Sequence, residues 1–305
     1  MKIFTPKDFP LPFETVITIG SFDGIHLGHQ ALIKETKKLA KELRLTPVVV
    51  TFEPHPRRIL FPDSNFKLLT TLEEKIELIS QTGIEHMVLI PFTKELAQWS
   101  PDLFVQEYIV DGLHAKGVVV GFNFGFGKNR KGNIDTLKHL GKKYNFLVNS
   151  VGPVIIDGII VSSSSIRNFL EKKEIETANK LLGRNYFFSG RVIEGKKRGE
   201  KLGFPTANLE IPPYKLIPPP GVYAVWVHYK NQLFKGAMNI GKKPTFEDRE
   251  LSIEVHIFDF NKDIYDEILK IEVIRYIRNE IKFPSIEALK NQIQLDCQFI
   301  RQLLT

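Results

Sequence analysis

At 305 residues, of which 43% are hydrophobic and 25% charged, the chain exceeds the usual size of one compact core, and two domains are expected. It has no run of about 18 apolar residues that could span a bilayer, only one cysteine, and an N-terminus unlike a signal peptide, which together predict a cytoplasmic protein. The net charge of +7 is spread evenly along the chain, which disfavours nucleic acid as a partner and suits small polyanions such as nucleotides.

The first half of the chain alternates strand-like and helical patterns. A capping box at Thr71 and Glu74 opens one helix, and apolar side chains recur at helical spacing in the others. Strands separated by helices predict βαβ units and a mainly parallel sheet. The predicted strands span 16–20, 47–52, 86–91 and 117–121, and the predicted helices span 27–43, about 165–182 and a segment that begins at Thr71.

The second half has no long helix between its strands, and its turns are rich in Gly, Pro, Asn and Asp. Asn231 and Gln232 form a tight connection between two of these strands. Short strands without crossover helices predict a small antiparallel β-barrel, and Ser285 is expected to cap a final helix. The predicted strands span 186–193, 222–229, 233–240, 252–258 and 268–277. We therefore expect two domains, 1–183 and 184–305.

The segment from Gly20 to His29 reads Gly-Ser-Phe-Asp-Gly-Ile-His-Leu-Gly-His, follows a buried strand and opens a helix. Glycines at such a junction let backbone N–H groups approach a phosphate, and the helix N-terminus adds positive potential. His26 and His29 project from the same face of a first helical turn, where they could donate hydrogen bonds to a phosphate that gains charge. Their spacing alone favours a metal-site fragment or surface residues over this role.

The complete pattern resembles the HxGH signature of the cytidylyltransferase-like nucleotidyltransferases, and its flanks resemble their prokaryotic FAD synthetase branch. The resemblance implies a Rossmann-like α/β domain that transfers AMP from ATP to FMN. At the position of Ser164 the family commonly has threonine, which keeps the hydroxyl. Three further stretches agree with the family, namely Thr51–Pro56, Gly121–Gly127 with Gly132, and Val161–Arg167.

Adenylyl transfer to FMN needs no general base, because the second pKa of a phosphate monoester is about 6 and the nucleophile is already ionised. The protein must supply positioning and charge neutralisation, with Mg²⁺ on the departing pyrophosphate. Asp23 either shapes the glycine turn, as an Asx-turn cap or otherwise, or takes part in nucleotide binding. The expected catalytic residues are His26, His29 and Arg167. The expected nucleotide- and phosphate-binding residues are Gly20, Phe22, Asp23, Gly24, Asn123, Ser163 and Ser164.

The segment Gly203-Phe-Pro-Thr-Ala-Asn208 lies between predicted strands of the barrel half. In an extended chain Thr206 and Asn208 point to one side and present a hydroxyl and an amide oxygen. Neutral oxygens of this kind suit Mg²⁺, which takes few protein ligands and completes its shell with phosphates and water. Taken alone, Pro-Thr-x-Asn is more typical of an ordinary turn.

The surroundings of this segment resemble the riboflavin kinase family over nearly the whole second half. Both halves together resemble the bacterial bifunctional riboflavin kinase/FAD synthetases. One departure is Asp263-Ile-Tyr-Asp266, where the family commonly reads Asp-Leu-Tyr-Gly. The matching stretches are Gly190–Leu202, Gly221–Ala224, Asn239–Gly241, Pro244–Phe246, Glu254–Phe260 and Tyr276–Phe283.

The kinase step implied by this resemblance has a neutral alcohol as its nucleophile, and a carboxylate base assists it. By motif position Glu254 is expected to be that base, although a lone acid in a strand could also be a surface residue. The basic loop Lys196-Lys197-Arg198 reads either as a phosphate-binding loop or as a solvated mobile one. The expected ATP-site residues are Gly199, Gly203, Pro205 and Thr206, with Thr206 and Asn208 as ligands of Mg²⁺.

The stretch from Gly236 to Lys242 imitates a P-loop, and we reject this interpretation. Lys243 stands where a P-loop has Ser or Thr, Pro244 follows directly, and no helical pattern comes after it. The stretch is therefore predicted to be a strand and turn of the barrel.

The expected small-molecule partners are riboflavin, FMN, FAD and ATP, without membrane, nucleic acid or an obligatory protein partner. Two other readings remain. One is a nucleotidyltransferase with a different phosphorylated substrate, which the barrel domain disfavours. The other is a flavin-binding or nucleic-acid-binding module without catalysis, which the presence of His26, His29, Asn208 and Glu254 disfavours. Because the two motif sets lie in separate domains, FMN is expected to be released and rebound between the steps.

Overall fold

The computed structural model describes residues 1–195, 199, 203–242 and 251–304. The chain folds into two compact units, Met1–Ser162 and Ser163–Thr305. Helices α6 (Ser163–Glu171) and α7 (Ile175–Leu182) belong to the second unit, where α7 packs on two barrel strands. The boundary that we expect between the two activities, at residues 183 and 184, stays a prediction.

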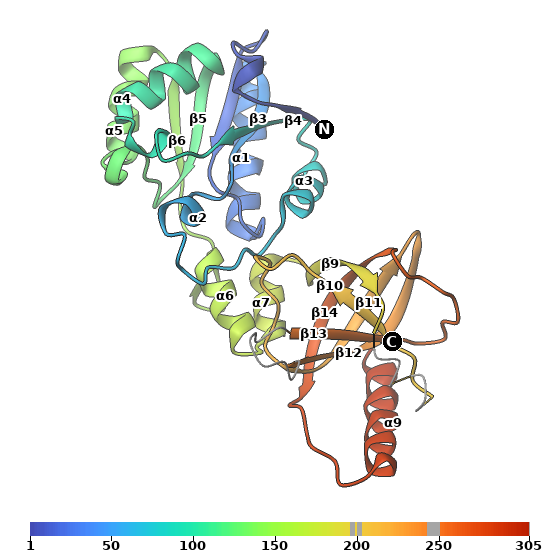
Figure 1. Cartoon of the computed structure of the whole chain (residues 1–305). Helices are drawn as coiled ribbons and strands as arrows, with labels where there is room; N and C mark the ends of the chain where they lie inside the picture. Colours follow the sequence, from blue (N-terminus) through green and yellow to red (C-terminus); the bar gives the residue numbers. More distant parts are fainter. Residues whose placement is uncertain (196–198, 200–202, 243–250, 305) are drawn as a thin grey trace. The chain divides into compact units, whose positions relative to one another are not determined.

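The first unit is a six-stranded, fully parallel sheet in the order β1-β4-β3-β2-β5-β6 (Figure 1). This confirms the predicted α/β architecture. Its strands are β1 (Lys2–Phe4), β2 (Thr15–Ile19), β3 (Thr46–Glu53), β4 (His86–Pro91), β5 (Ala115–Gly121) and β6 (Leu147–Val151). Its helices are α1 (Leu27–Leu43), α2 (Pro56–Leu60), α3 (Leu72–Ser80), α4 (Pro101–Phe104), the π-helix η3 (Val105–Gly112) and α5 (Ile134–Tyr144). Short elements are η1 (Pro6–Asp8), η2 (Leu96–Gln98), η4 (Lys128–Arg130) and the hairpin of β7 (Ile155–Ile156) and β8 (Ile159–Ile160).

Both faces of this sheet are covered, as the continuous apolar run of β2 requires. Val16 packs with Leu39 of α1, whereas Ile17, the next residue along the strand, packs in a second core with Leu137 of α5. A strand buried on both faces reads as an unbroken hydrophobic run because successive side chains point to opposite layers.

The strand order reverses direction beside β2. The chain runs from β2 outward through β3 to β4 and then returns to place β5 on the other side of β2. In open parallel sheets ligands bind outside the carboxyl ends of the strands at such a switch point. Gly20 follows the end of β2 and Gly121 ends β5, so both glycine-rich segments begin at this place.

The second unit contains a closed, antiparallel six-stranded barrel in the order β10-β13-β12-β11-β14-β9, which confirms the predicted barrel (Figure 1). Its strands are β9 (Tyr186–Ile193), β10 (Ala207–Glu210), β11 (Gly221–Tyr229), β12 (Gln232–Lys242), β13 (Leu251–Ile257) and β14 (Ile268–Arg278). The hairpin expected at Asn231 joins β11 to β12, and Lys230 within it has a φ of 54°.

Helix α9 (Ile286–Leu303) covers one outer face of the barrel. Ser285 accepts a hydrogen bond from the Ala288 N–H, as predicted for its N-cap. Arg278 at the end of β14 donates to both oxygens of Asp296 on the helix, and the Asp296 side chain is buried. Burial also raises the pKa of the Cys297 thiol to about 11. Among the described residues no helix is long and apolar enough to span a bilayer.

Candidate functional site

The turn that follows β2 is buried and tightly wound. Phe22 is fully buried with a φ of 47°, and Gly24 has a φ of 92°. A Cβ on Gly24 would lie 2.8 Å from Cδ1 of Leu69, so both its conformation and its surroundings require glycine. The turn is therefore held against the segment that precedes α3.

Asp23 joins the same two segments through hydrogen bonds. Its side chain is only 1% exposed, and Oδ1 accepts from the backbone N–H groups of Leu69 at 2.9 Å and Thr70 at 3.0 Å. Gly24 in turn donates its N–H to Oγ1 of Thr70. A buried carboxylate that accepts several N–H bonds shapes the backbone around it. The geometry thus gives Asp23 a turn-shaping contact, and its role toward a nucleotide stays a prediction.

His26 and His29 stand together at the start of α1. His26 is the N-cap, 6% exposed, and its Nδ1 accepts a hydrogen bond from the His29 N–H at 3.3 Å. Because Nδ1 is the acceptor, the proton of a neutral His26 lies on Nε2. The two rings are stacked, with centroids 3.6 Å apart and an interplanar angle of 16°.

The position of the His26 ring explains why the histidine motif has glycine at residue 28. A Cβ there would lie 3.1 Å from both Cε1 and Nδ1 of His26. Any larger residue would push the imidazole away from the helix. The motif therefore combines a capping histidine, a glycine that leaves room for its ring, and a second histidine stacked on the first, at the positive end of a 17-residue helix.

The end of β3 contributes a second wall at the same edge of the sheet. Thr51 donates its hydroxyl to the carbonyl of Ser21 in the glycine turn. His55 caps α2 by accepting from the Arg57 N–H, and its ring packs against Phe66. Between them lies Glu53, the last residue of β3, whose pKa is raised by burial against the opposing effect of nearby cations.

The glycine-rich segment after β5 is held by Arg130. Its guanidinium donates to the carbonyl of Asn123, and a Cβ on Gly125 would lie 2.9 Å from its Nε. Phe126 and Gly132 form an antiparallel bridge that closes the loop. This arrangement places Asn123 just beyond the end of β5, at the switch point beside β2.

Ser163, Ser164 and Arg167 lie on α6 in the second unit. Ile166 and Leu170 form the buried side of that helix, and Ser163 and Arg167 share a face four residues apart. The first unit therefore brings together the Gly20–His29, Thr51–His55 and Asn123 segments, whereas the roles of the three α6 residues stay predictions.

In the barrel, strand register builds the second site. Asn208 of β10 pairs directly with Glu254 of β13, and Glu254 pairs with Asn239 of β12. Directly paired residues in antiparallel strands point to the same face. The flanking residues Ile253 and Val255 are buried, whereas these three are half-buried. Glu254 therefore lies on the outer face of the barrel between two amide side chains.

Two glycines pack closely on the predicted metal ligands. A Cβ on Gly195 would collide with the amide of Asn208, and one on Gly199 would lie 3.3 Å from Oγ1 of Thr206. Among the described residues no hydrogen bond of the side chains of Thr206, Asn208 or Glu254 is found. Thr206 and Asn208 offer neutral oxygens, which is a donor set that fits Mg²⁺ bound jointly with phosphates.

Sequence reasoning missed two neighbours of this site. Asn239 was matched only as part of a motif, and its place beside Glu254 follows from register alone. Glu280 lies near it as well, because a Cβ on Gly241 would lie 2.8 Å from Oε1 of Glu280. No local sequence signal links residues that are separated by 15 or more positions, and only the barrel brings them together.

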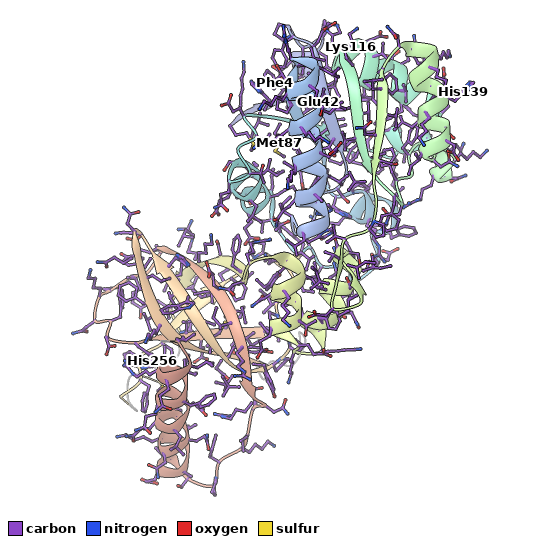
Figure 2. The ribbon with its side chains drawn as sticks, turned by 180° about the vertical axis from the view of Figure 1, so that it is seen from behind. Phe4, Glu42, Met87, Lys116, His139 and His256 are labelled. Atoms are coloured by element: carbon purple, nitrogen blue, oxygen red, sulfur yellow. The ribbon has the colours of Figure 1, made fainter. Side chains whose placement is uncertain are left out.

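His256 supports the Pro-Thr-Ala-Asn segment. Its Nδ1 donates a hydrogen bond to the Pro205 carbonyl at 2.8 Å, and its ring packs edge-on against Phe204. Burial lowers the pKa of His256 below its usual range. Figure 2 labels His256 beside α9, whose Arg301 also lowers the pKa of His256.

Some predicted features lie outside the described residues, namely Lys196–Arg198, Lys243 and Pro244–Phe246. The stretch Gly236–Lys242 is part of β12, so its rejection as a P-loop is confirmed. Among the described residues no group of three or more His, Cys, Asp or Glu side chains could hold a metal ion.

Comparison with known proteins identifies a family for each half of the chain. The family model of FAD synthetase matches residues 10–165, and that of riboflavin kinase matches residues 182–304. The bifunctional riboflavin kinase/FMN adenylyltransferase of Bacillus subtilis is 41% identical over 93% of this chain and 91% of its own length. The enzyme of the same name from Haemophilus influenzae is 37% identical over 92% of each chain. A solved structure described as a macrolide-efflux protein from Streptococcus pneumoniae has a TM-score of 0.91 and 33% identity, and covers 99% of both chains.

Proposed function

This chain belongs to the family of bifunctional riboflavin kinase/FMN adenylyltransferases, and from that premise we propose which of its residues perform each step. The enzyme uses ATP twice, first to phosphorylate riboflavin to FMN and then to adenylylate FMN to FAD. We assign adenylylation to residues 1–183 and phosphorylation to residues 184–305. A cytoplasmic location fits both steps, because each consumes ATP.

For adenylyl transfer, an oxygen of the FMN phosphate attacks the α-phosphorus of ATP, a new P–O bond forms and pyrophosphate leaves. His26 and His29 donate hydrogen bonds to the α-phosphate as its negative charge grows. The stacked rings, the proton on Nε2 of His26 and the N-terminus of α1 support this role. Arg167 neutralises the phosphates that depart.

The other adenylylation residues shape the site or bind phosphate. Asn123, Ser163 and Ser164 provide hydrogen bonds to phosphate oxygens, since their amide and hydroxyl groups suit such contacts. Gly20, Phe22, Asp23 and Gly24 form the turn along which the nucleotide lies. The buried hydrogen bonds of Asp23 support a rigid turn, and a rigid turn keeps its N–H groups aimed at the ligand.

For the kinase step, Glu254 accepts the proton of the ribityl 5′-hydroxyl while that oxygen attacks the γ-phosphorus and ADP leaves. Thr206 and Asn208 would hold Mg²⁺, which would supply positive charge beside the phosphates of ATP. Gly199, Gly203 and Pro205 line the nucleotide beside them. The observation that carries this proposal is the direct pairing of Asn208 with Glu254, because it sets a metal ligand beside the base on one face of the barrel.

Flavin chromatography after incubation with riboflavin, ATP and Mg²⁺ tests the two-site assignment. Wild type should form FMN and then FAD. His29→Ala should stop at FMN, and Glu254→Ala should convert supplied FMN to FAD but leave riboflavin unchanged. Each loss should reach about 10²-fold or more, the range of general acid–base and oxyanion-type contributions.

Two matched substitutions control this experiment. His139 is exposed on α5 (Figure 2), and Glu210 is exposed on β10. His139→Ala and Glu210→Ala should keep both activities. Loss of both activities in either test variant, or FAD formation by His29→Ala at the wild-type rate, would refute the assignment.

A further inference from the structure

Lys75 carries a buried charge, and none of the roles proposed above involves it. It stands in the second turn of α3, and its side chain is only 3% exposed. A lysine is almost never this buried unless it is paired, because removing an ammonium group from water is costly. Burial accordingly lowers the pKa of Lys75 below its usual value. The charged groups that act on Lys75 indicate why the chain keeps an ammonium group at this buried position.

The groups that act on Lys75 are two carboxylates of the proposed adenylylation site. Asp23 and Glu53 both attract its ammonium and oppose the effect of burial on its pKa. Glu53 also experiences the cation Arg58 and the carboxylate Glu73. Asp23 is buried and Glu53 half-buried, so water screens these charges less than it would at the surface.

Each carboxylate belongs to a different wall of the site. Asp23 lies in the glycine turn after β2 and accepts hydrogen bonds from residues 69 and 70, just ahead of α3. Glu53 ends β3 and receives the backbone N–H of Phe92 at its carbonyl. Lys75 projects from the helix that follows residues 69 and 70. Lys75 is thus buried on the helix that continues from the segment bonded to Asp23, and the charges of Asp23 and Glu53 both act on it.

We propose that Lys75 is a positioning residue for adenylyl transfer, whose buried ammonium compensates Asp23 and Glu53 and holds the glycine turn and the end of β3 in place for a polyphosphate. ATP and FMN are both anions, and two uncompensated carboxylates at this edge would repel them. With Lys75 charged, one of the two negative charges at this edge is balanced, so the turn keeps its carboxylate and repels the anionic substrates less.

A purely structural role would have different consequences. Removal of a buried compensating charge is destabilising when it leaves the opposite charges without a partner. Asp23 keeps its backbone N–H bonds and Glu53 is only half-buried, so Lys75→Met, which keeps most of the length of the side chain and removes the charge, should still fold. Lys75→Arg keeps the charge and changes the shape. The two variants therefore separate charge compensation from packing.

The same chain provides an internal control, because the residues proposed for riboflavin phosphorylation lie in its second unit. Lys75→Met should lower kcat/KM for FAD formation by about tenfold or more, mainly through KM for ATP, which is the scale of one uncompensated charge in partly buried surroundings. Riboflavin phosphorylation by the same sample should change less than twofold. Lys75→Arg should retain most of the FAD synthesis, and adding Glu53→Gln to Lys75→Met should restore part of it.

The pH profile gives a second readout. Without Lys75 the already raised pKa of Glu53 rises further, so lowering the pH neutralises Glu53 in the variant before it does so in wild type. The ratio of FAD synthesis by Lys75→Met to that by wild type should therefore increase as the pH falls from 8 to 6. A packing defect would leave this ratio constant.

Several outcomes would overturn the inference. They are wild-type FAD synthesis by Lys75→Met, equal losses in Lys75→Met and Lys75→Arg, or absence of rescue by Glu53→Gln. If Lys75→Arg folds but neither Lys75→Met nor Lys75→Gln does, Lys75 is a folding residue and the inference is wrong.

The inference rests on the proposed adenylylation site, and His29→Ala distinguishes a failure of the site assignment from a failure of the inference about Lys75. If His29→Ala keeps its FAD synthesis, the site assignment has failed, whereas a normal Lys75→Met beside an inactive His29→Ala refutes this inference alone.

Discussion

The two units position their proposed catalytic groups by different means. In the first, the groups stand on turns and helix ends at the edge of a parallel sheet, and each is held by its own contact, such as the capping bond of His26 or the buried bonds of Asp23. In the second, Asn208, Glu254 and Asn239 stand on neighbouring strands, and backbone pairing alone aligns them.

This difference determines where each site is vulnerable. A site on loops depends on supporting residues such as Gly28 and Arg130, whose loss displaces a functional group without touching the substrate. A site on barrel strands shares its support with the fold itself, so few single substitutions can misplace it without unfolding the unit. We therefore expect positioning mutations to affect FAD synthesis more than riboflavin phosphorylation.

The largest expected effect comes from His26, which caps α1 and is also proposed to donate a hydrogen bond to the α-phosphate. Two substitutions separate these functions. Asparagine is a good N-cap, so His26→Asn should keep α1 stable while it removes the imidazole. FAD formation should fall by about 10²-fold, the scale for loss of one donor to a developing charge. His26→Ala should lose the same activity and in addition about 1 kcal/mol of stability. Kinetics with FMN and ATP, together with thermal unfolding, measure both quantities.

A result in which His26→Asn keeps its activity would show that the capping bond, and not the ring, is what adenylylation needs. Riboflavin phosphorylation by the same variants serves as the control, because His26 lies in the other unit. It should match wild type in both variants.

A smaller effect is expected from Gly28→Ala. The new Cβ would stand 3.1 Å from the ring of His26, so the imidazole must shift by a few tenths of an ångström. FAD formation should decline by about tenfold, since a small misplacement of a catalytic group lowers rates by one to two powers of ten. The measurement is kcat with saturating FMN and ATP.

Gly152→Ala is the matched control for this substitution, because a Cβ at Gly152 meets nothing within 4 Å. It should behave as wild type. If Gly28→Ala and Gly152→Ala were equally active, the close fit between Gly28 and His26 would have no catalytic consequence.

The smallest effect concerns His256 and pH. Because the folded state lowers the pKa of His256, the unfolded chain binds a proton first as the pH falls. The stabilising contribution is complete above about pH 6.5, the unfolded value, and is lost as the pH falls through the lower folded value. Thermal unfolding of wild type between pH 7.5 and 5 should show this loss, and His256→Ala should show less of it.

His256→Ala should also lower riboflavin phosphorylation severalfold, because about 1 kcal/mol of hydrogen bonding to Pro205 no longer holds the Pro-Thr-Ala-Asn segment. FAD formation from FMN should remain at the wild-type rate. If thermal unfolding of His256→Ala depended on pH as strongly as that of wild type, a group other than His256 would cause the loss of stability at low pH.

Features that depend on neighbouring residues were predictable from the sequence. The capping box of Thr71 and Glu74 and the cap at Ser285 form as expected. Among the strands, β1 and β6 were not predicted. β1 has three residues, and β6 has an exposed and half-buried pattern without an apolar run. The brief β10 was likewise read only as a segment between strands.

By itself, then, the sequence determined the two architectures, the two motif sets and the family, because capping, periodicity and short motifs act over a few residues. Only the tertiary structure decided that Asp23 accepts its bonds from residues more than 40 positions away, that Asn239 stands beside Glu254, and that Lys75 is buried where the charges of Asp23 and Glu53 act on it. Such contacts depend on strand order and on which charges lose their water, and neither is encoded in a local stretch of chain.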